Sequence, residues 1–152
     1  MESQEIIEKI INGVAIVTSR RGNEVNGLSI AWMSQVCFDP QLIMISIGKD
    51  RLTHEFIKES KIFVINILTE KQKDLAKLFG LKSGRKINKF QTISYETGET
   101  GAPILKNCLA YLECKVYSSH KVADHTMFIG QVIHANKKSN ENPLIYNSKD
   151  YF

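Results

Sequence analysis

The sequence predicts an α+β fold, mainly β, in which helices flank an antiparallel barrel of about six strands. Six segments have the length and the β-branched or alternating composition of strands. Strands near both ends of the chain follow one another through short connections, as in hairpins. Helical patterns occur only at the start and in the middle, which disfavours a doubly wound parallel sheet.

The chain opens with a predicted helix, a short strand and a long strand. Residues 3–11 place isoleucines at helical spacing behind Ser3, a plausible N-cap, and Asn12-Gly13 ends this helix. Residues 14–18 form a short β-branched strand, and a glycine-containing turn joins them to residues 25–40. Period-two spacing predicts that residues 25–40 are one strand, paired with the first as a hairpin.

This long strand has the features of a wall against which a ligand could bind. We expect Leu28, Ile30 and Trp32 on one face. The other face carries mostly small residues, which let a flat ligand approach the backbone; these are Gly27, Ser29, Ala31 and Met33. An aromatic residue on a strand is more often part of the core, so that alternative stays open.

Two buried strands are predicted in the middle of the chain. Residues 42–47 and 61–68 are rich in apolar side chains and are bounded by turn residues or helices. A helix that ends near Ser60 separates them, with Phe56 and Ile57 facing inward.

The remaining chain contains one helix, two loops, two strands and a tail. Thr69 is expected to cap a helix that ends near Phe79. Alternation predicts that Glu113 lies on the strand face opposite to its apolar neighbours Leu112 and Cys114. The predicted loops are residues 80–89 and 96–103, and the predicted strands are residues 108–117 and 122–135.

Composition indicates a globular protein of one domain spanning residues 1–152. The net charge is +4, but the lysines and arginines are scattered, so a solvated surface explains them better than nucleic-acid binding does. Cys37, Cys108 and Cys114 are odd in number and form no CxxC pair, which argues against a disulfide framework and a zinc site and fits a reducing cytoplasm. The charged N-terminus predicts neither a signal peptide nor a membrane span.

Several familiar sites are absent from the sequence. No GxGxxG motif follows a strand, and no GxSxG, HExxH or EF-hand pattern occurs. The four histidines lack metal-ligand spacing, so no metal site is predicted, and His54 and His134 are most simply surface groups. His125 differs, because Asp124 precedes it and a hydrophobic strand follows. A structural role for His125 remains the alternative.

The loop at residues 48–53 is a candidate anion site. It joins a strand end to a helix start and carries Lys49, Arg51 and Thr53. A helix N-terminus offers unpaired N–H groups and a positive dipole end, which suit an anion. A capped surface helix with solvated cations is the alternative, and the loop lacks the P-loop pattern.

Together these features meet the demands of flavin mononucleotide (FMN), whose phosphate needs cations and hydroxyls and whose ring needs apolar walls. The chain also resembles the flavin reductase-like, flavoredoxin-like proteins of the FMN-binding split-barrel superfamily. The resemblance is carried by Asn26-Gly27 through Trp32, Phe38-Asp39-Pro40, Lys49 with Thr53, Asn88-Lys89-Phe90, and residues 124–130. It implies a six-stranded antiparallel Greek-key split barrel and a homodimer with FMN near the subunit interface.

The resemblance also implies roles for individual residues. Residues that would bind FMN are Asn26, Gly27, Leu28, Ser29, Ile30, Ala31, Trp32, Ser46, Ile47, Gly48, Lys49, Thr53, Asn88, Lys89, His125 and an aromatic of the tail, Tyr151 or Phe152. Thr53 would bind the phosphate, whereas Lys89 and His125 would approach the ring as catalytic residues. The chain departs from the family at Gln41, Cys37, Ala123, Lys86 and Asn88, and the last two make their loop more basic.

The predicted function is that of an oxidoreductase that passes electrons from NADH, NADPH or a protein donor through FMN to a flavin, a ferric chelate or a protein acceptor. A non-enzymatic electron carrier without a nicotinamide site is the alternative. A nucleic-acid-binding barrel is disfavoured, because the sequence lacks a stripe of aromatics interleaved with basic residues.

Overall fold

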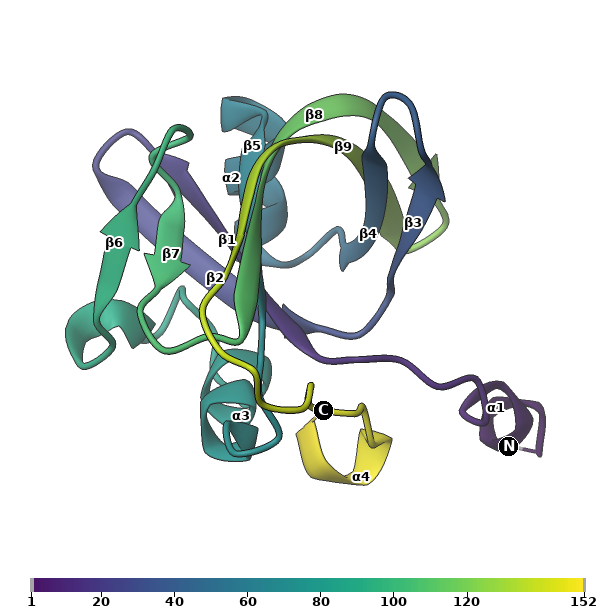
Figure 1. The fold of residues 1–152 in the computed structure, drawn as a ribbon. Coiled ribbons are helices and arrows are strands. Elements are labelled where there is room, and N and C mark those ends of the chain that lie inside the picture. The colour runs from purple at the N-terminus through teal and green to yellow at the C-terminus, as the bar shows by residue number, and fades with distance from the viewer. Residues whose placement is uncertain (1, 152) are drawn as a thin grey trace.

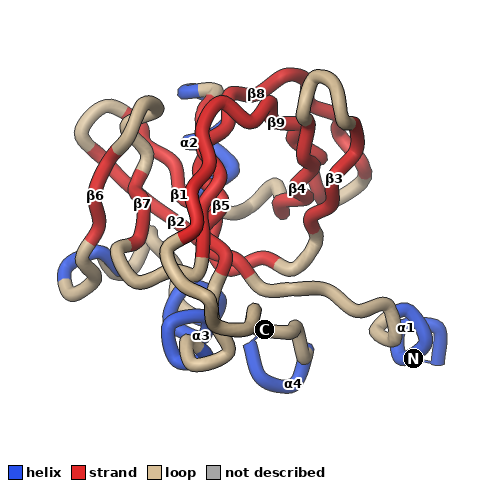
Figure 2. Tube along the Cα trace, viewed as in Figure 1, coloured by secondary structure: helices blue, strands red, loops and turns tan. Residues whose placement is uncertain are grey.

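A computed structural model describes residues 2–151 of the chain. A seven-stranded antiparallel sheet curls into a barrel, and helices lie at its ends and sides (Figures 1 and 2). The strands are ordered β2-β1-β5-β8-β9-β4-β3. Their bounds are β1 (Ala15–Arg21), β2 (Glu24–Ile30), β3 (Met33–Cys37), β4 (Leu42–Gly48), β5 (Ile62–Ile67), β8 (Ala110–Val122) and β9 (His125–Lys137).

The prediction of a mainly antiparallel structure with flanking helices is confirmed, but the strand count of six is wrong for the sheet. Residues 25–40 do not form one strand. They form β2 and β3, which lie at opposite edges of the sheet. A continuous strand of sixteen residues would extend about 50 Å at roughly 3.3 Å per residue, more than a small barrel can accommodate. The chain therefore leaves β2 after Ile30 and crosses at Ala31-Trp32 to pair with β4.

Hairpins account for most of the sheet. β1 and β2 pair in the predicted hairpin, and Gly22 adopts a φ of +59° in its turn. β8 and β9 form a longer hairpin than predicted, and Ala123 in its turn has a φ of +52°, a conformation that glycine adopts at lower cost.

The helices confirm part of the predicted pattern. α2 (Leu52–Ser60) buries Phe56 and Ile57, as expected. α3 (Lys73–Leu81) begins later than predicted, and its N-cap residue is Gln72 and not Thr69. The side chain of Gln72 accepts a hydrogen bond from the backbone N–H of Thr69, which holds residues 69–72 in a turn before the helix. The remaining helical segments are α1 (Glu2–Ile7), which is shorter than predicted, η1 (Lys89–Gln91) and α4 (Ser148–Tyr151). No helix within residues 2–151 has the length and apolar character needed to cross a membrane.

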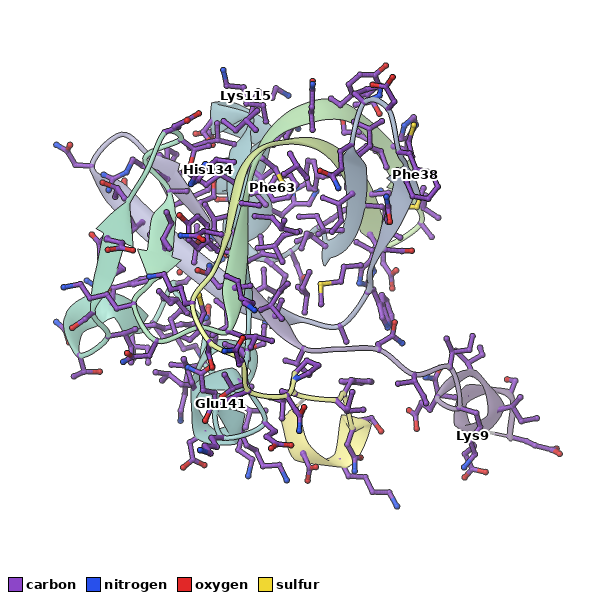
Figure 3. All side chains as sticks on the ribbon, viewed as in Figure 1. Lys9, Phe38, Phe63, Lys115, His134 and Glu141 are labelled. Atoms are coloured by element: carbon purple, nitrogen blue, oxygen red, sulfur yellow. The ribbon has the colours of Figure 1, made fainter. Side chains whose placement is uncertain are left out.

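Two apolar clusters form the core. One fills the barrel around Phe63, which points between the strands in Figure 3, together with Ile45 and Phe128. Gly130 faces this ring so closely that an added Cβ would lie 2.4 Å from it. The second cluster lies between the sheet, α3 and a small hairpin of β6 (Tyr95–Thr97) and β7 (Pro103–Leu105), which flanks the predicted loop at residues 96–103.

Glu113, which was predicted to lie on the strand face opposite to Leu112 and Cys114, is fully buried, as Cys114 is. A β-bulge between Glu113 and Cys114 disrupts the alternation of β8. The carboxylate accepts hydrogen bonds from the backbone N–H groups of Glu99 and Thr100 and from the Thr100 hydroxyl, at 2.8–3.2 Å. These bonds offset part of the cost of burying the charge.

Candidate functional site

Two adjoining cavities open where β2, β4, β9 and the start of α2 meet. Each has a volume of about 290 Å³, and they share Leu28, Asp50 and Arg51 in their walls. We call them the apolar cavity and the polar cavity, after the side chains that line them. A ligand with a flat apolar part and an anionic end could occupy both at once.

The apolar cavity is enclosed mainly by strand residues and aromatic rings. The rings of Trp32 and His125 lie in contact at its mouth, with centroids 5.0 Å apart. The remaining lining residues not shared with the polar cavity are Ser29, Ile30, Ala31, Ser46, Ile47, Gly48 and Tyr146. A planar ring could therefore lie against apolar walls with few polar groups at its edge.

The neighbouring strands position His125 at this mouth. His125 begins β9 and pairs in register with Gly48 at the end of β4. The backbone N–H of Lys49 donates to the carbonyl of Asp124 at 3.0 Å, and the Asp124 carboxylate lies 2.8 Å from His125 Nδ1. The hydrogen bond to His125 lowers the pKa of Asp124. With Nδ1 engaged, Nε2 is the ring nitrogen that can meet a ligand.

The polar cavity contains a buried lysine. Lys89 is only 4% exposed, and its Nζ donates to the backbone carbonyls of Gly27 at 3.0 Å and Phe79 at 3.3 Å. Burial, followed by the nearby charge of Arg51, lowers the pKa of Lys89 to about 8. No carboxylate among the described residues forms an ion pair with it. An anion in this cavity would supply the missing counter-charge.

Hydroxyl, amide and cationic groups complete the polar cavity. Thr53 is buried in the first turn of α2, and its Oγ1 accepts a hydrogen bond of 2.9 Å from Asn26 Nδ2. Arg51 occupies the N-cap position of α2 without capping it through its side chain. Arg85 reaches from the loop after α3 to the Glu55 carboxylate at 2.9 Å and so ties that loop to α2.

Most of the residues predicted for the site line one of the two cavities. Leu28, Ser29, Ile30, Ala31, Trp32, Ser46, Ile47, Gly48 and His125 line the apolar cavity, and Asn26, Gly27, Thr53 and Lys89 line the polar one. Lys89 was expected near a ring; it lines the polar cavity and not the apolar cavity that Trp32 and His125 line.

Some predicted residues lie elsewhere. Lys49 is exposed and lines neither cavity, and Asn88 caps η1 by accepting a bond from the N–H of Phe90. The backbone of Tyr151 lies in α4, and Phe152 lies outside the described residues. Among the described residues, the tail contributes the aromatic side chain of Tyr146 to the apolar cavity.

Sequence reasoning also missed several site residues. Asp50, Ser83, Arg85 and Tyr146 line the cavities without having been singled out, and Arg51 was noted only as a loop cation. The position of Arg51 directly before a helix start was the available signal. His54 is not a surface group but is buried, with Nε2 2.8 Å from the Thr126 hydroxyl, and burial lowers its pKa.

Comparison with known proteins gives the same family at the level of sequence and of fold. The profile of the flavin reductase like domain matches residues 7–152. A high molecular weight rubredoxin of Moorella thermoacetica is 38% identical over 136 residues, which are 88% of this chain and 59% of that protein. The NADH:FAD oxidoreductase SgcE6 of Streptomyces globisporus superposes with a TM-score of 0.88 at 27% identity, covering 95% of this chain and 87% of the other.

An FMN-binding protein from Thermus thermophilus has a TM-score of 0.81 at 30% identity, over 84% of this chain and 73% of the other. The chain spans about three fifths of the Moorella rubredoxin and of a curated relative from Archaeoglobus fulgidus, and about one fifth of a diflavin flavoprotein of Nostoc. The match of the domain profile to nearly the whole chain, together with these structural similarities, shows that the chain belongs to the flavin reductase-like family.

Proposed function

We propose that the chain binds a flavin, as FMN, across the two adjoining cavities. The observation that carries this proposal is their junction at Leu28 and Arg51, which sets apolar walls beside a cluster of cations and hydroxyls. FMN has the same division between an apolar ring system and a phosphate. The FMN-binding protein of Thermus thermophilus, which shares this fold, supports the choice of ligand.

The polar cavity would hold the phosphate. Lys89 and Arg51 supply positive charge, and Thr53 supplies a hydroxyl that Asn26 orients. The N-terminal turn of α2 adds unpaired N–H groups and its positive dipole end. The sequence contains no adenine or pyrophosphate motif, which favours FMN over FAD as the bound form.

The apolar cavity would hold the ring. Trp32 and His125 would flank it at the mouth, and Ser29, Ser46 and the adjacent backbone would meet its polar edge. The bound flavin supplies the redox chemistry, whereas the protein binds, orients and tunes it. His125, fixed through Nδ1 by Asp124, presents Nε2 toward this mouth and is the residue to which we assign a catalytic contact.

The function supported best is that of an oxidoreductase that takes electrons from NADH or NADPH and delivers them through FMN to a flavin or a ferric chelate. The relative SgcE6 is an NADH:FAD oxidoreductase, which supports a nicotinamide donor. A carrier that exchanges electrons only with redox proteins is the second candidate, favoured by the similarity to a high molecular weight rubredoxin. We place the protein in the cytoplasm, because its three cysteines are unpaired.

Two measurements test this proposal. Heat release of the cofactor from purified protein, followed by chromatography, should yield FMN at about one per chain; recovery of FAD, or of no flavin from protein offered FMN, rejects the assignment. Steady-state oxidation of NADH and NADPH by FMN-loaded protein separates the two candidates. Turnover with either nucleotide identifies an enzyme, and its absence together with reduction by a redox protein identifies a carrier.

We further propose that the working unit is a homodimer. The apolar cavity is open at Trp32, which remains 49% exposed, so one chain leaves part of this wall uncovered. Light scattering at micromolar concentration should give twice the chain mass of 17.3 kDa. A monomer that keeps its flavin would reject the dimer while leaving flavin binding intact.

A further inference from the structure

The N-terminal segment at residues 2–11, which we call the arm, presents an apolar surface that nothing covers within the described chain. No residue of α1 is buried, and the four isoleucines of the arm are between 56% and 79% exposed. These are Ile6, Ile7, Ile10 and Ile11. A helix of six residues is too short to persist in water on its own propensity. The arm therefore needs a surface to pack against.

The root of the arm is fixed, and its direction leads away from the barrel. Val14 N–H donates to the Leu144 carbonyl and Tyr146 N–H donates to the Asn12 carbonyl, at 2.9 and 2.8 Å. Figure 1 shows α1 at the end of an extended segment that departs from the sheet, and Figure 3 shows Lys9 beside this outlying helix, in the turn that follows it. The arm does not fold back onto its own strands.

A second uncovered apolar surface lies along the edge strand β3. Trp32, Val36 and Phe38 are 49%, 50% and 89% exposed, and β4 is the one strand that pairs with β3 in the described sheet. Figure 3 places Phe38 at the outer end of β3. Large apolar side chains on an unpaired sheet edge are usually covered by another element or another chain.

The arm and the body of the chain also carry opposite charge. Residues 1–11 contain three glutamates and one lysine, a net charge of −2, so the rest of a chain with a net charge of +4 carries +6. This imbalance favours docking of the arm on another copy of the same basic body.

We propose that the arm of each copy packs on the β3 edge of a second copy, so that its isoleucines cover Trp32, Val36 and Phe38 and close the open side of the apolar cavity. One chain carries both halves of this contact, and a two-fold axis satisfies both halves at once. The inference rests on the dimer proposed above and goes beyond it by naming the segment that the partner contributes to the site.

Cys37 lies within β3 and allows a direct test. Cys108 and Cys114 are buried, so Cys37 is the accessible native thiol. A chain carrying Ile7→Cys or Ile11→Cys together with Cys37→Ser, mixed with wild-type chain under oxidised glutathione, can join its arm to Cys37 only between two copies. A chain with Lys106→Cys and Cys37→Ser, whose new thiol is exposed on another part of the body, controls for random encounter.

We expect a disulfide between the arm position and Cys37, identified by mass spectrometry, in at least tenfold excess over the Lys106→Cys control. Yields equal to the control at both arm positions overturn the inference. Replacing all four isoleucines with serine should weaken the dimer at least tenfold and shift the emission of Trp32, the one tryptophan, to longer wavelength. If this variant dimerises as wild type does and its emission is unchanged, the arm is not the cover.

These readouts do not depend on turnover. FMN binding is measured in parallel on the wild-type chain and on the four-serine variant, and it separates the two proposals. If the wild-type chain binds FMN but no cross-link forms, the arm contact alone is rejected. If the wild-type chain does not bind FMN, the proposed function is rejected. A wild-type monomer whose arm instead binds zwitterionic lipid vesicles would likewise overturn the inference.

Discussion

The ammonium group of Lys89 donates a hydrogen bond to the backbone carbonyl of Gly27, so that a buried cation is held against strand β2 in the wall of the polar cavity. The two carbonyls that receive its bonds carry only partial charge, and the charge of Arg51, which has the same sign, helps to lower its pKa. This arrangement leaves positive charge available for a phosphate.

The first prediction is that FMN affinity depends on pH through Lys89. Its pKa of about 8 lies below the usual 10.5, so the charged form that attracts phosphate is present below pH 8 and is lost as pH rises through that value. A hydrogen bond to a charged group contributes about 2 kcal/mol, or roughly thirtyfold in Kd. Because the bound phosphate raises this pKa in turn, affinity should fall by about tenfold or more between pH 7 and 9.5. Lys89→Met should show the weak affinity at every pH.

Riboflavin, which lacks the phosphate, is the control for this titration. Its affinity should be the same in wild-type and Lys89→Met protein and should not change over this range. If wild-type FMN affinity is flat from pH 7 to 9.5, the contact between Lys89 and the phosphate is rejected.

The second prediction concerns the Thr53 hydroxyl. Thr53→Val keeps the shape of the side chain but removes the oxygen that accepts the bond from Asn26 Nδ2. A buried donor that loses its partner costs about 1–3 kcal/mol, so both the free energy of unfolding and FMN affinity should fall. Thr53→Ser should restore both to near wild type. Denaturant unfolding and calorimetric titration with FMN measure the two effects. Wild-type affinity in Thr53→Val would contradict the assignment.

The third prediction uses Trp32 as a reporter. Its indole lines the apolar cavity beside His125, so a flavin ring bound there should quench its emission. Titration with FMN or riboflavin should give saturable quenching, whereas inorganic phosphate should give none. Quenching that rises linearly with FMN, without saturation, would show that the ring does not bind beside Trp32.

The fourth prediction follows from the β8–β9 turn. Ala123 has a φ of +52°, where a side chain costs about 1 kcal/mol relative to glycine. Ala123→Gly should therefore stabilise the protein by up to about 1 kcal/mol, and thermal unfolding should show a higher midpoint. Ala123→Val, which adds a branched side chain at the same φ, should be destabilising. The prediction fails if both substitutions lower the midpoint equally.

Local patterns in the sequence were enough to predict much of the sheet. The β1–β2 hairpin, β4 and the inward face of α2 with Phe56 and Ile57 depend on neighbouring residues, which spacing reveals. The break after Ile30 could not be predicted in this way, because it depends on how the barrel closes between two distant edges.

Long-range contacts explain the errors at single residues. His54 is buried because Thr126, seventy-two positions away, supplies its hydrogen bond. Glu113 is buried because a distant loop brings amides to its carboxylate. The resemblance to the family brought Lys89 into the site, but only the fold shows that it faces the polar cavity. Sequence periodicity carries no information on such pairings.

The last prediction separates two cations of one loop. The sequence placed Lys49 and Arg51 together in one candidate anion loop. The structure leaves Lys49 exposed beyond both cavities and places Arg51, two residues later, in the wall that both cavities share. Arg51→Ala should raise the Kd for FMN at least tenfold, equivalent to about 1.4 kcal/mol, and leave riboflavin binding unchanged. Lys49→Ala should change the Kd for FMN by less than twofold, because a solvated charge at that position is screened. Calorimetric titrations of both variants at matched ionic strength measure the difference. A larger loss in Lys49→Ala than in Arg51→Ala would return the phosphate to the exposed side of the loop and reject the polar cavity as its site.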